Sequence, residues 1–343
     1  MDTTLDTHPD ERSAVQLLAD ATRALTGAGI DTARLDAEVL LAAAWGVDRT
    51  GVYLRAREAV PAAVDAGFRA SLARRCAREP LQYIVGRQEF WSMEFVVTPD
   101  VLIPRPETEL LVELASATVR DCSLSLPPSK KGDRGGVVRT MHRQIPRDLP
   151  FSKGGTRRRT EDLQGLVREG QDEGFATRLC DVGTGSGCVA VALARELPDA
   201  EIWALDISRS ALVVAHANAH CHGVAGRVRC VESDLFAAVA EQRFDVIVSN
   251  PPYVSATELA GGQAEVQWEP RRALDGGGPA GLEVIERLLS AAPAHLIDGG
   301  WVLVEIGAGQ GDAVVALARA AGLRDVVVRP DYAGLPRVVM ARR

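Results

Sequence analysis

The apolar positions of the first eighty residues recur with the 3.6-residue period of amphipathic helices. One stripe comprises Val15, Leu17, Leu18, Ala21 and Leu25, and a second comprises Leu35, Val39, Leu40 and Ala43. Asp31 is the expected N-cap of the second helix, and Pro61 suits the first turn of a third helix that should extend to about Arg78. Residues 1–80 are therefore predicted to form a small helical domain.

Residues 81–106 carry a different pattern, in which aromatic and β-branched residues come in two runs. The runs are 82–86 and 90–97, and the polar residues between them predict a β-hairpin. Pro104 and Pro106 then predict a rigid link, which leads into a helix from Glu107 to about Val119. For Arg105 and Glu107, a functional role and a scaffolding role both remain open.

Residues 121–176 interrupt these patterns, because they are rich in Ser, Pro, Gly, Lys and Arg and show no sustained period. We predict a disordered insertion, since ordered loops of this length are uncommon. A short helix near residues 163–168 is the alternative. The part from Lys130 to Arg159 is strongly basic. A solvated loop is the favoured interpretation, and an arm that contacts nucleic acid or the ribosome is the other.

From residue 177 onward, apolar runs of strand length alternate with helical patterns. The expected strands are 177–182, 201–205, 228–231, 244–248, 301–306, 324–329 and 335–341, and the expected helices are 188–197, 208–220, 281–295 and 310–321. Such alternation predicts an α/β fold with right-handed crossovers. The segment 330–336 is too short for a crossover helix, so the last two strands should pair antiparallel. We expect a Rossmann-like, seven-stranded, mostly parallel sheet with one antiparallel strand.

Composition narrows the class of protein. The chain is 46% hydrophobic with a net charge of −7, which argues weakly against a nucleic-acid partner. No apolar run is long enough to cross a bilayer, and the polar start does not resemble a signal peptide. The six cysteines form no CxxC pair, so we expect reduced thiols and a cytoplasmic protein.

A glycine-rich turn, Gly183-Thr184-Gly185-Ser186-Gly187, follows the strand 177–182. Such a turn lets a ligand approach the backbone and directs N–H groups of the following helix at it. Asp206, at the end of the next strand, is placed to accept hydrogen bonds from ribose hydroxyls. Enzymes that bind NAD and enzymes that bind S-adenosylmethionine share this pairing.

Two further features favour S-adenosylmethionine. Asp181, just before the glycines, could face the ammonium group of the ligand, and a dinucleotide has no such group. Asp234 and Leu235 end the third strand of the sheet, where they offer an acceptor for an adenine amine and an apolar contact for its ring. The alternative role for Asp234 is a helix N-cap.

The stretch Asn250-Pro251-Pro252-Tyr253 follows the strand 244–248, at the end where ligands bind in parallel sheets. The two prolines fix a stiff turn without competing N–H donors. Asn250 Oδ1 and the Pro251 carbonyl could hold both hydrogens of a planar NH2 group, with the Tyr253 ring as a flat wall. We predict methyl transfer to such a group, with Asn250, Pro251 and Tyr253 as catalytic residues. A Pro-rich turn that merely ends a strand is the alternative.

With these motifs the chain resembles the peptide chain release factor N5-glutamine methyltransferases, the HemK/PrmC family of S-adenosylmethionine-dependent class I methyltransferases. The resemblance covers nearly all of the chain outside 121–176, and its specific parts are 103–109, 181–187, 249–253 and Trp268-Glu269-Pro270. It implies that residues 183–187, Asp206, Leu235 and Asn250 contact the cofactor. It also implies that residues 250–253 hold a glutamine of the Gly-Gly-Gln loop of release factors. Residue 235 departs from the family, since some relatives have Trp there.

The resemblance also implies a division of labour along the chain. Residues 1–80 would recognise the substrate, 81–106 would link the domains, and 107–343 would form the methyltransferase domain. No membrane or DNA partner is expected, whereas a position near the ribosome stays open.

Other interpretations of these motifs have weaker support. An adenine-N6 DNA methyltransferase shares Asn-Pro-Pro-Tyr but should carry a basic cleft, and a non-catalytic, ribosome-associated module that binds S-adenosylmethionine would not need Asn250. His216, His220 and His222 have near-metal spacing, yet no clear carboxylate completes a set, so we expect no metal. The chain also contains Gly261-Gly262-Gln263, the same tripeptide that the family modifies in release factors. Its presence in a Gly-rich loop is most simply a coincidence.

Overall fold

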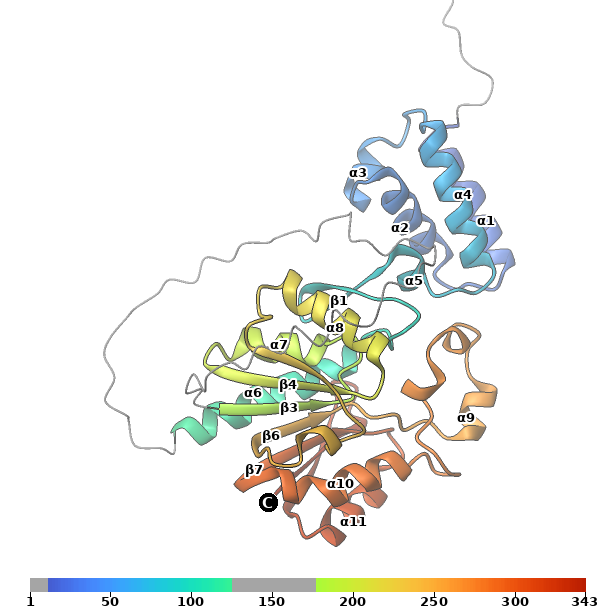
Figure 1. Ribbon diagram of the computed structural model, residues 1–343. Helices are drawn as coiled ribbons and strands as arrows, with labels where there is room; N and C mark the ends of the chain where they lie inside the picture. The colour runs from blue at the N-terminus through green and yellow to red at the C-terminus, as the bar shows by residue number, and fades with distance from the viewer. Residues whose placement is uncertain (1–11, 125–176) are drawn as a thin grey trace, which may run out of the picture.

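The computed structural model describes residues 12–124 and 177–343 (Figure 1). The predicted insertion therefore lies mostly outside the described residues, as does the alternative helix near 163–168. Residues 121–124 belong to a helix, which corrects the expected start of the insertion. No helix within 12–124 or 177–343 is long and apolar enough to cross a membrane.

The N-terminal part is a bundle of short helices with its own core. Its helices are α1 (Ala14–Gly27), α2 (Ala33–Trp45), α3 (Arg49–Leu54), α4 (Ala62–Cys76) and α5 (Leu81–Val85). Ser13 caps α1 through a capping box with Gln16. Leu17, Leu25 and Phe68 are among the buried residues of this core. The predicted helical character of this region is confirmed.

Three details of the predicted helices are wrong. Val15 and Leu35 were placed on the buried stripes, but they are 51% and 41% exposed. In α2, alanines share the buried face with leucines, so the apolar pattern alone misplaced its centre. The N-cap of α2 is Thr32 instead of Asp31. Helix α3 was not predicted, although the Asp48 side chain caps it by accepting from Gly51 N at 2.6 Å.

The predicted hairpin exists, but its first strand lies further along the chain. Residues 82–85 belong to α5, and the hairpin consists of β1 (Arg87–Phe90) and β2 (Met93–Val96). Pro80 starts α5, and Gly86 ends it in the left-handed conformation. The Tyr83 hydroxyl donates to the Val101 carbonyl at 2.6 Å, which buries the ring in a helical position. Tertiary packing therefore overrides the β-propensity of this run.

The C-terminal part contains a seven-stranded sheet in the order β5-β4-β3-β6-β7-β9-β8. Its strands are β3 (Thr177–Val182), β4 (Ala200–Asp206), β5 (Val228–Glu232), β6 (Phe244–Ser249), β7 (Leu296–Glu305), β8 (Arg324–Pro330) and β9 (Pro336–Arg342). The strands β3 to β7 pair in parallel, and β9 runs antiparallel to both β7 and β8. The predicted Rossmann-like sheet with one antiparallel strand is confirmed.

Helices cover both faces of this sheet (Figure 1). They are α6 (Glu109–Leu124), α7 (Cys188–Glu196), α8 (Arg209–Cys221), α10 (Glu283–His295) and α11 (Gly311–Ala320). One core contains residues of α6 and α7, and a second contains residues of α10 and α11. The link between hairpin and α6 contains the 3-10 turn η1 (Pro106–Thr108). The segment after β6 carries α9 (Ala256–Gly261), η3 (Val266–Trp268) and η4 (Arg271–Ala273).

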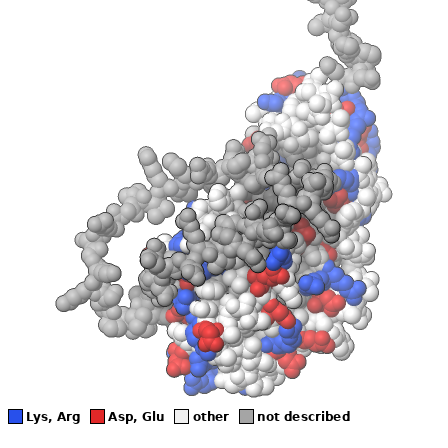
Figure 2. Space-filling view, viewed as in Figure 1, with Lys and Arg blue, Asp and Glu red and all other residues white. Residues whose placement is uncertain are grey.

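The surface carries both signs of charge. On the face shown in Figure 2, acidic and basic side chains of the described residues are interspersed.

Candidate active site

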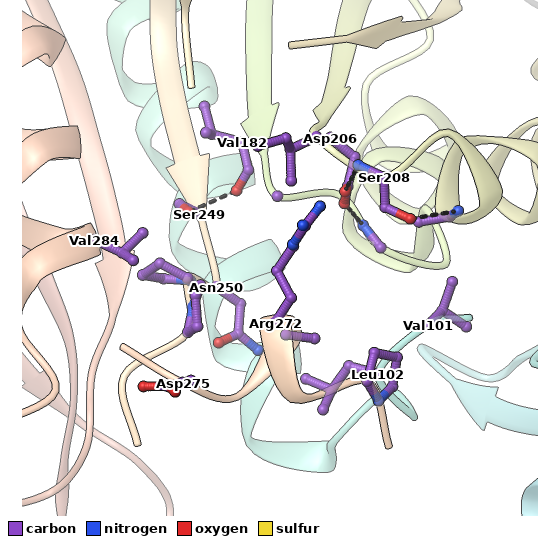
Figure 3. Close-up of a pocket in the computed structure, with 18 of the residues that line it drawn as sticks. Val101, Leu102, Val182, Asp206, Ser208, Ser249, Asn250, Arg272, Asp275 and Val284 are labelled. Carbon is purple, nitrogen blue, oxygen red and sulfur yellow. Dashed lines mark hydrogen bonds between the residues drawn. The ribbon is translucent and has the colours of Figure 1, made fainter. Parts of the chain in front are cut away.

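A cavity of about 800 Å³ opens at the carboxyl ends of β3, β4, β5 and β6 (Figure 3). Predicted site residues in its lining are Gly183, Gly185, Asp206, Asp234, Leu235, Asn250, Pro251 and Pro252. A volume of this size suits a small-molecule ligand. The structure therefore brings the motifs of four strand ends together around one space.

The glycine turn is held by hydrogen bonds to β4. Gly183 N and Thr184 N both donate to the Leu205 carbonyl, at 2.8 and 2.9 Å, and Gly185 N donates to Asp206 Oδ2 at 2.8 Å. Gly183 and Gly185 have positive φ angles of 77° and 55°, which L side chains rarely adopt, and a Cβ atom on either would meet open space. A ligand can thus approach this backbone closely.

Asp181 does not face the cavity, contrary to expectation. Its side chain is 2% exposed beneath the glycine turn, where it accepts from Thr184 Oγ1 at 2.6 Å. Burial raises the pKa of Asp181 to about 7, and the hydrogen bonds from Thr184 and the Ala190 backbone oppose this rise. Asp181 therefore holds the turn from below.

The remaining residues of the turn, Thr184, Ser186 and Gly187, do not line the cavity. Thr184 and Ser186 are buried, and a Cβ atom on Gly187 would approach Ala215 Cβ to 2.9 Å. Asn218 Nδ2 donates to the Ser186 carbonyl at 2.8 Å, while its Oδ1 accepts from Val96 N at 2.8 Å. Asn218 thereby fastens the hairpin to the turn.

Asp206 stands at the rim of the cavity with both carboxylate oxygens engaged. They accept from Gly185 N and Ser208 N, each at 2.8 Å. Burial raises the pKa of Asp206, and these hydrogen bonds and the nearby Arg272 cation oppose the rise. In Figure 3 the Arg272 side chain extends from η4 into the cavity toward Asp206. Sequence reasoning missed Arg272, since nothing in an exposed Pro-Arg-Arg run identifies which arginine turns inward.

Asp234 and Leu235 both line the cavity, next to α10. The Asp234 carboxylate pairs with Arg287 of that helix at 2.8 Å, and both side chains are about half exposed. Leu235 has a positive φ of 50°, a conformation that is uncommon for a branched residue and is often found at functional sites.

The turn after β6 presents two acceptors to the cavity. Asn250 Nδ2 donates to Thr108 Oγ1 at 3.0 Å, so the amide group is anchored by its nitrogen. Within the described part of the chain, no donor occupies Asn250 Oδ1 or the Pro251 carbonyl. Ser249 Oγ donates to the Val182 carbonyl at 2.6 Å and ties β6 to β3 beside this turn (Figure 3).

The partly buried Tyr253 and the buried Glu305 support the turn from behind. Tyr253 does not line the cavity, and its hydroxyl donates to Glu305 Oε1 at 3.3 Å. Burial is the first cause that raises the pKa of Tyr253, and the Glu305 charge adds to it. Glu305 is 1% exposed, its Oε2 has no hydrogen-bond partner in the described structure, and burial raises its pKa to about 7. The sequence carries a signal for Glu305 that the sequence analysis did not use, because Glu305 is a single acid at the end of the apolar strand β7.

Two glutamates that flank η3, Glu265 before it and Glu269 after it, attach this region to the rest of the molecule. Glu269 Oε2 accepts from Ile103 N at 3.1 Å, and Glu269 Oε1 pairs with Arg105. Glu265 pairs with Arg75 at 2.9 Å and with Arg78 at 2.7 Å, both at the end of the helical domain. Arg105 thus makes a scaffolding contact. The near-metal spacing of the histidines has another explanation at His222, whose ring nitrogen bonds the Glu94 carbonyl at 2.9 Å.

The sheet order and the glycine turn at β3 define a class I methyltransferase fold. Two family models match, one described as PrmC N-terminal domain over residues 16–86 and one as Methyltransferase small domain over residues 163–278. The chain is 37% identical over 338 residues to a release factor glutamine methyltransferase of Geobacter sulfurreducens, covering 98% of this chain and 99% of that protein. It is 42% identical over 329 residues to one of Cereibacter sphaeroides, covering 94% and 98%. The chain belongs to the family of release factor glutamine methyltransferases.

The chain is also similar to solved structures at lower identity. One of the similar chains is a ribosomal protein L11 methylase from Lactobacillus delbrueckii subsp. bulgaricus, with a TM-score of 0.37 and 20% identity over 53% of this chain and 74% of that chain. A similarity of this size adds nothing to the assignment.

Proposed function

We propose that this protein transfers a methyl group from S-adenosylmethionine to the side-chain amide nitrogen (N5) of the glutamine in the Gly-Gly-Gln loop of a peptide chain release factor. The observation that carries the proposal is a pair of acceptors, Asn250 Oδ1 and the Pro251 carbonyl, to which no described residue donates, at the edge of a cavity that also contains Asp206. The names of the relatives point to the same substrate.

The residues around the cavity fit S-adenosylmethionine. Asp206 offers carboxylate acceptors for the ribose hydroxyls, and the open space above Gly183 and Gly185 admits a chain against the backbone. Asp234 and Leu235 offer an acceptor and an apolar contact for the adenine. When bound, S-adenosylmethionine supplies an electrophilic methyl group on a positively charged sulfur.

The chain's own residues have to activate a poor nucleophile, because the lone pair of an amide nitrogen is delocalised. Asn250 Oδ1 and the Pro251 carbonyl would accept one amide hydrogen each, which fixes the NH2 group and directs its face toward the methyl group. The same oxygens stabilise the positive charge that grows on nitrogen as the N–C bond forms and the C–S bond breaks. One amide proton is then released to solvent, and the products are a neutral N-methyl amide, a thioether and that proton.

The substrate should be a protein instead of duplex DNA. Duplex binding requires a run of cationic side chains, whereas the charges on the face in Figure 2 alternate in sign. We also place the protein in a reducing compartment such as the cytoplasm, since Cys180 and Cys188 are buried free thiols.

The test is to incubate the protein with methyl-labelled S-adenosylmethionine and a purified release factor, and to identify the modified residue by mass spectrometry. Asn250→Ala should lower turnover by about 10²- to 10³-fold, the usual effect of losing one preorganised contact to developing charge. Cofactor binding should remain largely intact. Gln263→Ala is the matched control, because it removes the glutamine of the chain's own Gly261-Gly262-Gln263 and should not change turnover.

Retention of more than about a tenth of wild-type turnover by Asn250→Ala would refute the mechanism. Methylation of adenine in a duplex, with the release factor unmodified, would replace the proposed substrate.

A further inference from the structure

Thr108 lies directly behind the reacting turn, although it does not line the cavity. It ends η1 and is 2% exposed. Its hydroxyl oxygen accepts from Asn250 Nδ2 at 3.0 Å, and its hydroxyl group also lies against the buried carboxylate of Glu305. Thr108 is thus in contact with both Asn250 and the buried acid Glu305.

When Glu305 is in its charged form, the chemistry of these three groups fixes the direction of their hydrogen bonds. An ionised carboxylate can only accept, and a threonine hydroxyl has a single proton to give. When Thr108 gives that proton to Glu305, its oxygen is left as an acceptor toward Asn250. Only the nitrogen of the Asn250 amide can then face Thr108, so Oδ1 must point the other way.

The orientation of the Asn250 amide decides whether the turn can bind its substrate. With Oδ1 turned toward the cavity, two acceptors meet the NH2 group of a glutamine side chain. If the amide were rotated by half a turn, its own NH2 group would face the substrate NH2 group, and two donors would oppose each other.

We propose that Thr108, supported by Glu305, is a positioning residue that holds the Asn250 amide with Oδ1 directed at the substrate. The inference rests on the proposed amide methylation and deepens it, because it explains how one of the two acceptors is kept in the productive orientation. Thr108 acts through Asn250 and touches neither substrate nor cofactor.

The decisive comparison is between Thr108→Val, which keeps the shape of the side chain but removes the hydroxyl, and Thr108→Ser, which keeps the hydroxyl. Loss of the acceptor leaves Asn250 Nδ2 unpaired in the orientation that transfer needs, so Thr108→Val should lower kcat by about 10- to 100-fold. The dissociation constant of S-adenosylhomocysteine should change less than about twofold, since the cavity lining is untouched. Thr108→Ser should recover kcat to within about threefold of wild type.

Thr118→Val is the matched control. Thr118 is also a poorly exposed threonine, on α6, and its hydroxyl donates to the Leu114 carbonyl at 2.8 Å. The same substitution there should leave kcat unchanged, although it removes a hydroxyl of the same kind.

Wild-type kcat in Thr108→Val would overturn the inference. It would also be overturned if Thr108→Val and Thr108→Ser lost activity equally, together with weaker cofactor binding, because that result indicates a general structural role. A failure of the proposed function looks different. In that case the wild-type protein itself would leave the glutamine of the release factor unmethylated.

Discussion

The buried carboxyl group of Glu305 makes the stability of this protein depend on pH. Burial raises its pKa from 4.5 to about 7. The Thr108 and Tyr253 hydroxyls and the Arg337 cation favour the charged form, whereas the nearby Glu107 disfavours it. Since the folded-state pKa lies above the unfolded value, Glu305 contributes stability that is complete below about pH 4.5 and is lost as the pH rises through about 7.

The size of this effect follows from the two pKa values. A shift of about 2.5 units corresponds to about 3 kcal/mol in total, at about 1.4 kcal/mol for each unit. Part of this stabilisation is already lost at mildly acidic pH. Between about pH 5.5 and about pH 8.5, Glu305 should lower the free energy of unfolding by about 2 kcal/mol.

Glu305→Gln isolates the contribution, because glutamine has nearly the same shape and does not titrate. The assay is urea unfolding of the cofactor-free protein at both pH values, followed by circular dichroism. The decrease in unfolding free energy from low to high pH should be about 2 kcal/mol smaller in the variant than in wild type. Asp181, whose pKa burial also raises to about 7, remains in both proteins and cancels in the comparison.

Glu232→Gln serves as the control, since this glutamate ends β5 on the surface, in an ion pair with Arg209 at 2.9 Å. Glu232→Gln should show the same pH dependence of the unfolding free energy as wild type. If Glu305→Gln lost as much stability as wild type between the two pH values, the Glu305 carboxyl would not be desolvated as the structure shows, and the reasoning would be wrong.

Two further predictions concern the surroundings of the turn. Gly281 has a φ of +67°, and a Cβ atom on it would overlap the Tyr253 carbonyl oxygen. Gly281→Ala should therefore lower the melting temperature and reduce methyl transfer more than tenfold. The control is Gly334→Ala, at φ +82° with no neighbour within 4 Å, which should show only the backbone penalty of about 1–2 kcal/mol. Equal effects of the two substitutions would contradict the steric argument. Glu265→Gln should weaken the pairs with Arg75 and Arg78 and raise KM for an intact release factor several-fold, with little change for a short Gly-Gly-Gln peptide. An equal change for both substrates would show that these pairs do not serve recognition.

Much of the fold could be predicted because its signals are local. The strands of the sheet are β-branched apolar runs ended by turn residues, and their alternation with helices leaves few topologies. The errors arose where tertiary packing decides. Val15 and Leu35 fit a helical stripe but lie at its edge, and residues 82–85 have strand composition but are held as a helix by Pro80 and Gly86.

The candidate site was predictable to the extent that its residues sit in motifs. Gly183 and Asn250 follow β3 and β6, Asp206 ends β4, and parallel pairing brings the ends of these strands together. Thr108 and Glu305 were not identified, because their importance depends on being behind Asn250 in space. The division into a recognition domain, a link and a methyltransferase domain stays a prediction, as do the individual roles of the site residues.

The segment from Glu265 to Arg272 connects three parts of the molecule that are far apart in sequence. Glu265 pairs with two arginines of the helical domain, Glu269 binds the link through Ile103 N and Arg105, and Arg272 enters the cavity beside Asp206. Pro270 stiffens the path between the second and third of these contacts. A movement of the helical domain relative to the sheet must therefore break the pairs of Glu265 or displace the segment that lines the cavity. The same segment follows the Asn250 turn along the chain. A substrate that binds the helical domain can therefore change the geometry of the Asn250 turn through the connecting backbone as well as through side-chain packing.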